Sequence, residues 1–322
     1  MTLLFPQLRQ DPIVDRWVLI APERAARPTE VVFPGRLVRS ASCPFCEGHE
    51  GETPPEVFAL RQPGSRPDGP GWRVRVIPNL FPAVRRDVES GYGVHEVVIE
   101  CPQHEASLAA LATEQVLDVF AVYRDRLAAL ATDPLLGYVQ VFKNHGAAGG
   151  ASVEHAHSQM LGTSLVPREL RAELDAAAAY HDRHGRCIFC DLIDRELSDG
   201  QRVILETDHF VAVAAWAGRF PYETWLLPRR HEARFDRLTD VELTDLAAAI
   251  RTILRRLAAV AGDPAYNMVL HTAPAGEAPH YHWHWEILPR TTGIAGYEVA
   301  TGSYLNPLPP EEAAARLRRE EV

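Results

Sequence analysis

Lysine and long apolar runs are what this sequence lacks: Lys143 is its single lysine, and no stretch of 18 consecutive residues is apolar. The missing apolar run excludes an ordinary transmembrane helix. The N-terminal segment has no basic region followed by an apolar stretch, so it does not resemble a signal peptide, and we expect a cytoplasmic protein. The net charge of −10 argues against general nucleic-acid binding, which needs a basic surface.

Cysteine is also scarce, with five in 322 residues, which is too few for a disulfide framework in a reducing compartment. Four of the five form two C-x-x-C pairs, Cys43 with Cys46 and Cys187 with Cys190, and Cys101 is left over. Such a pair is either redox-active or half of a zinc site. Two pairs in a chain with 14 histidines favour zinc.

The length allows two domains, or one domain built from two halves, and the order of the motifs predicts the second. Each C-x-x-C pair is followed by a strand-like stretch that ends in a histidine, His104 or His231. A long segment then follows, 106–130 or 236–262, whose apolar residues recur at the three- and four-residue spacing of an amphipathic helix. A short strand and a second histidine cluster complete each unit.

The spacing of the histidines agrees with an internal duplication. His104 and His155 are 51 positions apart, and so are His231 and His282. We therefore predict two tandem repeats, 1–166 and 167–322. Segment 166–186 is expected to form a helix at their junction, and the Pro/Gly-rich stretch 61–72 a surface loop.

The duplication predicts two metal sites of the same composition. The first ligand set is Cys43, Cys46, His104 and His155, and the second is Cys187, Cys190, His231 and His282. Two cysteines and two histidines form a closed tetrahedral site for structural zinc, so two zinc ions per chain are expected. The alternative is a pair of metal-free clusters made of core cysteines and hydrogen-bonded histidines.

The stretch "HAHSQ" carries a candidate for catalysis. If it is a strand, His155, His157 and Gln159 share one face. The preceding "NHGAAGGAS" has the small residues that let backbone amides approach an anion. His157 then suits nucleophilic attack on phosphorus, and Gln159 can donate to a phosphoryl oxygen. Alternatively, His157 is a metal ligand or a hydrogen-bonded structural histidine.

With these motifs in order, the chain resembles the galactose-1-phosphate uridylyltransferase branch of the histidine-triad superfamily. The resemblance rests on H-x-H-x-Q, "CPFC", "NLF" at 79–81, "CPQH" and the C-terminal "AGYEVATGSYLNPLPPEEAAARLRR". It implies an α+β fold with one broad, mostly antiparallel sheet formed by both repeats and flanked by helices. It also implies a homodimer whose partners contribute to each other's sites.

The resemblance implies a ping-pong reaction in which His157 takes a uridylyl group from UDP-glucose and passes it to galactose 1-phosphate. The binding residues that it implies are Arg24, Arg27, Asn144, Ser152 and Gln159 for phosphates, Asn79 and Phe81 for the nucleoside, and Tyr297 and Glu298 for the hexose.

The motif departs from the family pattern at Ala156 and Ser158, and so is similar to plant-type ADP-glucose phosphorylases. This departure leaves the nucleobase and the acceptor open, but we favour uridylyl transfer between hexose phosphates over phosphorolysis of ADP-glucose. Nucleotide hydrolysis and a non-enzymatic two-zinc binding module are the remaining alternatives. Some family members hold a metal with one glutamate and three histidines, which would correspond to Glu173, His271, His282 and His284 here. The matched spacing favours the cysteine-containing set.

His284 is a rival nucleophile by symmetry with His157. It lacks a glycine-rich segment before it, and Glu286 occupies the position of Gln159, where a carboxylate would repel phosphate. We therefore interpret His284 as structural or as flanking the substrate.

Overall fold

The computed structural model describes residues 6–26, 43–105, 107–276 and 278–322. Their strands are β1 Gln7–Gln10, β2 Trp17–Ile20, β3 Phe58–Arg61, β4 Trp72–Pro78, β5 Gly93–Ile99, β6 Tyr138–His145, β7 His157–Thr163, β8 Val203–Glu206, β9 Phe210–Ala214, β10 Thr224–Pro228, β11 Tyr266–His271, β12 His284–Pro289 and β13 Tyr304–Asn306. The α-helices are α1 Thr113–Leu130, α2 Arg168–His184, α3 Ile188–Asp199, α4 Asp240–Ala261, α5 Gly296–Thr301 and α6 Pro310–Arg319.

Ten strands form one antiparallel sheet in the order β3-β4-β5-β7-β6-β11-β12-β10-β9-β8. Each half of the sheet has five strands, and the two halves have the same order when each is read from its outer edge to the centre. The first half is β3, β4, β5, β7 and β6, and the corresponding strands of the second half are β8, β9, β10, β12 and β11. The two halves meet where β6 pairs with β11, with Asn144 opposite Asn267. This arrangement confirms the predicted fold class and shows the internal symmetry that the histidine spacing indicated.

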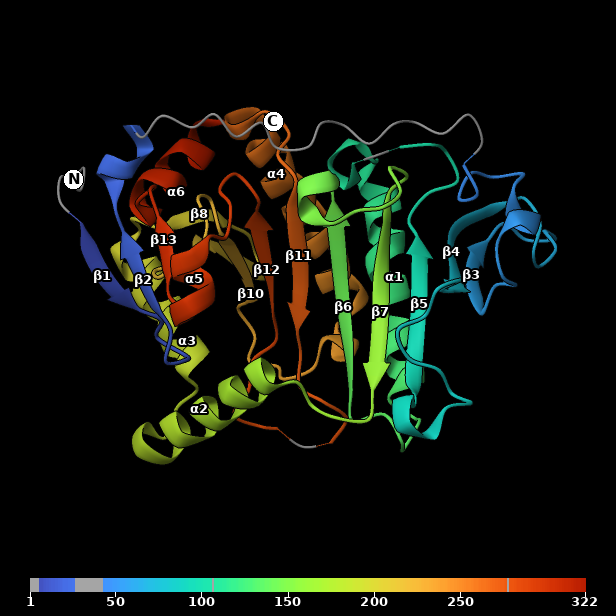
Figure 1. Cartoon of the computed structure of the whole chain (residues 1–322), viewed down its shortest axis with the longest axis horizontal. Coiled ribbons are helices and arrows are strands. Elements are labelled where there is room, and N and C mark those ends of the chain that lie inside the picture. Colours follow the sequence, from blue (N-terminus) through green and yellow to red (C-terminus); the bar gives the residue numbers. More distant parts are fainter. Residues whose placement is uncertain (1–5, 27–42, 106, 277) are drawn as a thin grey trace.

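The two long predicted helices, α1 and α4, lie together behind the sheet in Figure 1 and pack on the same side of it. Phe120 of α1 and Ile250 of α4 are completely buried in the main core, together with Trp285 of β12. A capping box between Thr239 and Glu242 begins α4. The helix α1 begins at Thr113, later than predicted, because residues 108–110 form a separate 3-10 turn.

The helix predicted across the junction is present as α2, and α3 follows it without having been predicted. These two helices belong to a second core that includes Phe189 of α3 and Trp225 of β10. The short strands β1, β2 and β13 form a separate three-stranded sheet. Figure 1 shows this sheet beside α5 and α6, at the end of the molecule farthest from β3. Among the described helices, none is long and apolar enough to cross a membrane.

Candidate functional site

The first predicted ligand set forms a compact cluster, with ligand atoms within 4.8 Å of one another. The Nδ1 atom of His155 lies 3.6 Å from the sulfur atoms of both Cys43 and Cys46, and Nδ1 of His104 lies 3.4 Å from that of Cys46. On its other side, His155 donates from Nε2 to the carbonyl of Cys101 at 2.8 Å. That hydrogen bond places the Nδ1 lone pair toward the cysteines.

The second set forms an equivalent cluster. His231 and His282 direct Nδ1 toward Cys190 at 3.5 and 3.6 Å. Their Nε2 atoms donate to the backbone carbonyls of Pro279 and Pro228 at 2.8 and 2.9 Å. Cys190 lies in the first turn of α3, His231 follows β10 and His282 precedes β12. The cluster therefore joins a helix to two loops that are distant in the sequence.

Both clusters have the dimensions of a zinc site. A tetrahedral ion with ordinary zinc–sulfur and zinc–nitrogen bonds separates its sulfur and nitrogen ligands by about 3.6 Å. The sulfur–nitrogen distances of 3.4 to 4.0 Å surround this value. Three of the four histidines, His155, His231 and His282, donate from Nε2 to carbonyl groups and so present the unprotonated Nδ1 that a metal needs. The two clusters can therefore each hold one metal ion.

Glu173, His271 and His284 make a third cluster of possible ligands. His271 contacts Glu173 at 2.9 Å through Nδ1. The alternative four-residue set from the family pattern is divided in this structure, because His282 directs Nδ1 to the cysteines instead.

The stretch "HAHSQ" differs in one detail from its prediction: β7 begins at His157, and His155 precedes the strand. Ser158 hydrogen-bonds Tyr123 of α1, so it points to the helical side of the sheet. Since side chains alternate along a strand, His157 and Gln159 point to the opposite side. These two residues share a face as predicted.

His157 is held in one tautomer. Its Nδ1 donates to the carbonyl of His155 at 2.8 Å, which leaves the lone pair on Nε2. Burial lowers the pKa of His157 below its usual value, and the nearby ammonium of Lys143 lowers it further. A neutral imidazole with a free Nε2 is the form of histidine that acts as a nucleophile.

Behind the nucleophile candidate lies a buried polar network. Lys143 donates to Glu100 at 2.7 Å and to the carbonyl of His157 at 3.0 Å. Tyr123 donates to the second oxygen of Glu100 at 3.1 Å. Lys143 and Glu100 are 1% and 0% exposed, so this ion pair is fully withdrawn from water. The single lysine of the chain thus holds the backbone at His157.

Gln159 is oriented by a residue that the sequence analysis missed. The backbone N–H of Ala83 donates to Nδ1 of His95, so the proton of this imidazole is on Nε2. That nitrogen lies 2.8 Å from Oε1 of Gln159 and donates to it. This contact occupies the amide oxygen of Gln159 and leaves its amide nitrogen as the donor. The pairing of β5 with β7 brings His95 next to Gln159, and no local sequence signal identified this neighbour.

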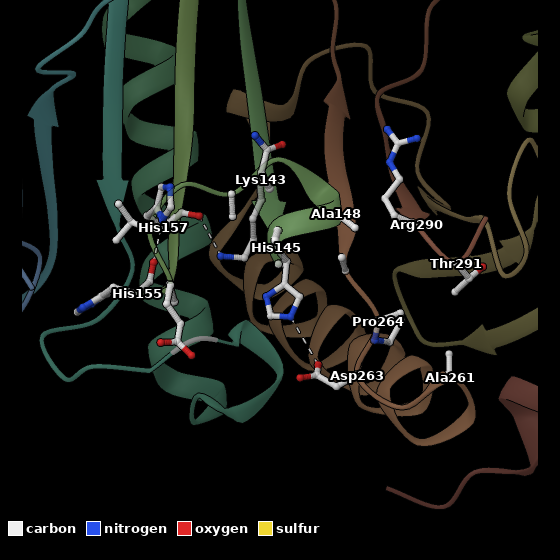
Figure 2. A pocket seen from close by; sticks show the side chains of 18 of the residues that line it. Lys143, His145, Ala148, His155, His157, Ala261, Asp263, Pro264, Arg290 and Thr291 are labelled. Atoms are coloured by element: carbon white, nitrogen blue, oxygen red, sulfur yellow. Dashed lines mark hydrogen bonds and ion pairs between the residues drawn. The ribbon is translucent and has the colours of Figure 1, made fainter. Parts of the chain in front are cut away.

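The Gly/Ala-rich segment forms a tight loop against the second half of the chain. A Cβ atom on Gly149 would lie 2.8 Å from the carbonyl oxygen of Tyr266, and Gly150 has a φ of +86°. Both positions therefore require glycine. This loop and the residues 154–157 line a cavity of about 580 Å³, shown in Figure 2, together with Asp263 and Arg290.

The equivalent position in the second half is closed. His284 is 1% exposed, and its Nδ1 donates to the carbonyl of His282 as His157 does to that of His155. Glu286, which replaces Gln159, is paired with Arg219. His284 lines neither the 580 Å³ cavity beside His157 nor the neighbouring groove of about 720 Å³. Its geometry favours the structural interpretation.

The predicted substrate residues fall into two groups. Asn144 lines the cavity, Ser152 lies exposed in the loop, and Asn79 begins a turn by accepting from the backbone N–H of Phe81. Phe81 is 84% exposed beside this turn.

The second group lies near the three-stranded sheet. Arg24 follows β2 in a 3-10 turn, and Tyr297 and Glu298 belong to α5, which packs against β13. None of these three lines the cavity beside His157 or the neighbouring groove. The carboxylate of Glu298 accepts from the N–H of Ala295 and caps the helix. Arg27 lies outside the described residues.

Comparison with known proteins shows that the chain matches the two domains of one protein family. The C-terminal domain of galactose-1-phosphate uridyl transferase matches residues 173–320, and the N-terminal domain matches 84–167. The ADP-glucose phosphorylase of Arabidopsis thaliana is 36% identical and aligns with 97% of this chain and 92% of that protein. The galactose-1-phosphate uridylyltransferase of Thermotoga maritima is 27% identical, with 98% and 99% covered.

The crystal structure of the Arabidopsis thaliana ADP-glucose phosphorylase with bound ADP-glucose superimposes with a TM-score of 0.87 at 36% identity, covering 98% of this chain and all of that one. The chain is therefore an enzyme of the nucleotidyltransferase class. It belongs to the galactose-1-phosphate uridyl transferase family, as its motifs predicted.

Proposed function

We propose that the protein transfers a nucleotidyl group from a nucleoside-diphosphate hexose through a covalent intermediate on His157. The observation that supports this proposal is the arrangement of two residues on one face of β7: His157 keeps its lone pair on Nε2, and Gln159 has its amide oxygen engaged by His95, which leaves the amide nitrogen as a donor. The cavity beside His157, with its Gly/Ala-rich wall, supplies room for a phosphate.

In the first half-reaction, Nε2 of His157 attacks the α-phosphorus and forms a phosphorus–nitrogen bond. The bond from this phosphorus to the bridging oxygen breaks, and the hexose 1-phosphate leaves with that oxygen. Gln159 donates to a non-bridging oxygen, where charge must be stabilised in the transition state. In the second half-reaction an acceptor phosphate oxygen attacks the same phosphorus, and His157 regains its lone pair.

Two acceptors are proposed. Adenylyl transfer to inorganic phosphate, which converts ADP-glucose to ADP and glucose 1-phosphate, is supported by the 36% identity to the plant phosphorylase. Uridylyl transfer from UDP-glucose to galactose 1-phosphate, the reaction favoured in the sequence analysis, is supported by the family domains and the 27% identical bacterial enzyme.

We propose zinc as the metal in both Cys₂His₂ clusters, because thiolate and imidazole ligands at these distances suit it. Each ion would cross-link segments that are distant in the sequence. The first would join the segment that precedes β7 to the loop after β5. The chain's own residues at the reaction centre are His157 and Gln159, which are not among the ligands.

We also propose a homodimer in which Arg24, Tyr297 and Glu298 serve the partner's site. These residues lie near β13, away from His157 in the same chain, although the resemblance assigns all of them to the substrate. An exchange between two chains would bring both groups to one substrate.

The test is the covalent intermediate. Purified protein is incubated separately with ADP-glucose and UDP-glucose, and its intact mass is measured, with peptide mapping to locate the nucleotide. The expected result is one nucleotidyl group on His157 and none in a His157→Asn variant. Absence of an adduct with both sugars would refute the proposal. Discharge of the isolated adduct by phosphate, galactose 1-phosphate or water then identifies the acceptor.

A further inference from the structure

Arg290 follows β12 and faces the site from the second half of the chain. It lines the 580 Å³ cavity beside His157 and also a neighbouring groove of about 720 Å³. Figure 2 shows His157 and Arg290 on opposite sides of the cavity, with Ala148 of the Gly/Ala-rich loop between them. Neither the sequence motifs nor the resemblance gave this residue a role.

The guanidinium group of Arg290 is fixed but not neutralised. Its Nε donates to Oδ1 of Asn267 at 2.5 Å, and its Cζ atom lies 4.4 Å from the centre of the Phe220 ring. Across the described residues, Arg290 has no ion pair with a carboxylate. Its partial burial and the nearby charge of Arg219 lower its pKa, so its cation is held at some cost in solvation. An anion would offset this cost.

Asn267 connects Arg290 to the loop. Its side-chain nitrogen donates to Oδ1 of Asn144 and to the carbonyl of Gly149, both at 2.7 Å. Asn144, Asn267 and Arg290 thus form a polar row from β6 across β11 to the end of β12. The strands β7, β6, β11 and β12 are successive neighbours, so β7 and β12, the strand that Arg290 follows, are three strand spacings or roughly 14 Å apart. A pyrophosphate whose first phosphate is bound at His157 would extend along this row toward Arg290.

We propose that Arg290 binds the phosphate group that does not become attached to His157. This group is the second phosphate of the nucleotide sugar as it leaves and the acceptor's phosphate as it enters. The paired Nη atoms of an arginine suit such a phosphate because they donate two parallel hydrogen bonds. The proposal rests on the proposed function for its place in the reaction. It requires in addition that the protein without bound nucleotide sugar binds free phosphate.

The experiment measures phosphate binding directly, by calorimetric titration with inorganic phosphate and, separately, with glucose 1-phosphate. The variants are Arg290→Met, Arg290→Lys and the control Arg73→Met, which removes an exposed arginine paired with Asp118. We expect Arg290→Met to weaken binding roughly 10- to 100-fold, the loss of hydrogen bonds to a charged group. Arg290→Lys should be intermediate, and the control should equal wild type. The ligand that binds more tightly, inorganic phosphate or glucose 1-phosphate, identifies the kind of phosphate group that Arg290 binds.

Wild-type protein that binds neither ligand, or an Arg290→Met variant that binds within two-fold of wild type, would overturn the proposal. Equal thermal unfolding of the variants and wild type checks that the fold is intact. The outcomes also separate the two hypotheses. Phosphate binding that depends on Arg290 without any nucleotide on His157 would uphold this subsite and refute the proposed reaction. An adduct on His157 that phosphate discharges equally in Arg290→Met would do the reverse.

Discussion

Replacing Lys143 by methionine tests whether the buried ion pair supports the strand that carries His157. The variant leaves the carboxylate of Glu100 without its cation at a position with 0% exposure. Removing one partner of a buried pair costs about 3–5 kcal/mol. Tyr123 still donates to the other carboxylate oxygen, so we expect the lower end, about 3 kcal/mol. The measurement is the free energy of unfolding from urea denaturation at a fixed zinc concentration.

The double variant Lys143→Met/Glu100→Gln isolates the charge. A glutamine accepts the same hydrogen bond from Tyr123 and has no charge to bury, so the remaining loss is the bond from Lys143 to the carbonyl of His157. That bond contributes about 1 kcal/mol, and the double variant should therefore be more stable than Lys143→Met alone. The reasoning is refuted if the single variant loses less than 1 kcal/mol, or if the two substitutions destabilise additively.

Three further predictions follow from the site. His95→Phe removes the donor that orients Gln159, so steady-state kinetics should show kcat reduced roughly ten-fold, and an unchanged kcat would contradict the orientation argument. Cys46→Ser should reduce the zinc measured by atomic absorption from two ions per chain to one and lower the unfolding midpoint; retention of both ions would show that the ligand set is wrong. His284→Gln should still give the adduct on His157 in folded protein, and loss of the adduct would indicate that the second histidine takes part in the chemistry.

The two Cys/His clusters and the repeat could be predicted because their signals lie in the order and spacing of residues along the chain. A C-x-x-C pair and equal histidine spacings are visible in the chain without knowledge of its pairing. The contacts of His95 and Arg290 depend on which strands become neighbours, and strand order is set by tertiary packing. The alternation predicted for Gln159 was correct, whereas the strand began two residues later than the pattern suggested. Secondary-structure boundaries depend on hydrogen bonds that composition does not specify.

The placement of Tyr297 and Glu298 could not have been predicted from motifs either. The resemblance groups them with the substrate, but their distance from His157 depends on how the C-terminal segment packs on β2 and β13. A motif identifies a residue by its chemistry, whereas its location within one chain or across two depends on assembly.

The contact between Gly149 and Tyr266 has a consequence for how this duplicated protein divides its work. The loop that surrounds the cavity takes its shape from β11, a strand of the other repeat, and Asn267 of that strand holds the loop carbonyl. The second repeat buries its own histidine, His284, but its strand β11 shapes the loop of the cavity beside His157. Neither repeat expressed alone would therefore reproduce the cavity beside His157, because its loop takes its shape from a strand of the other repeat.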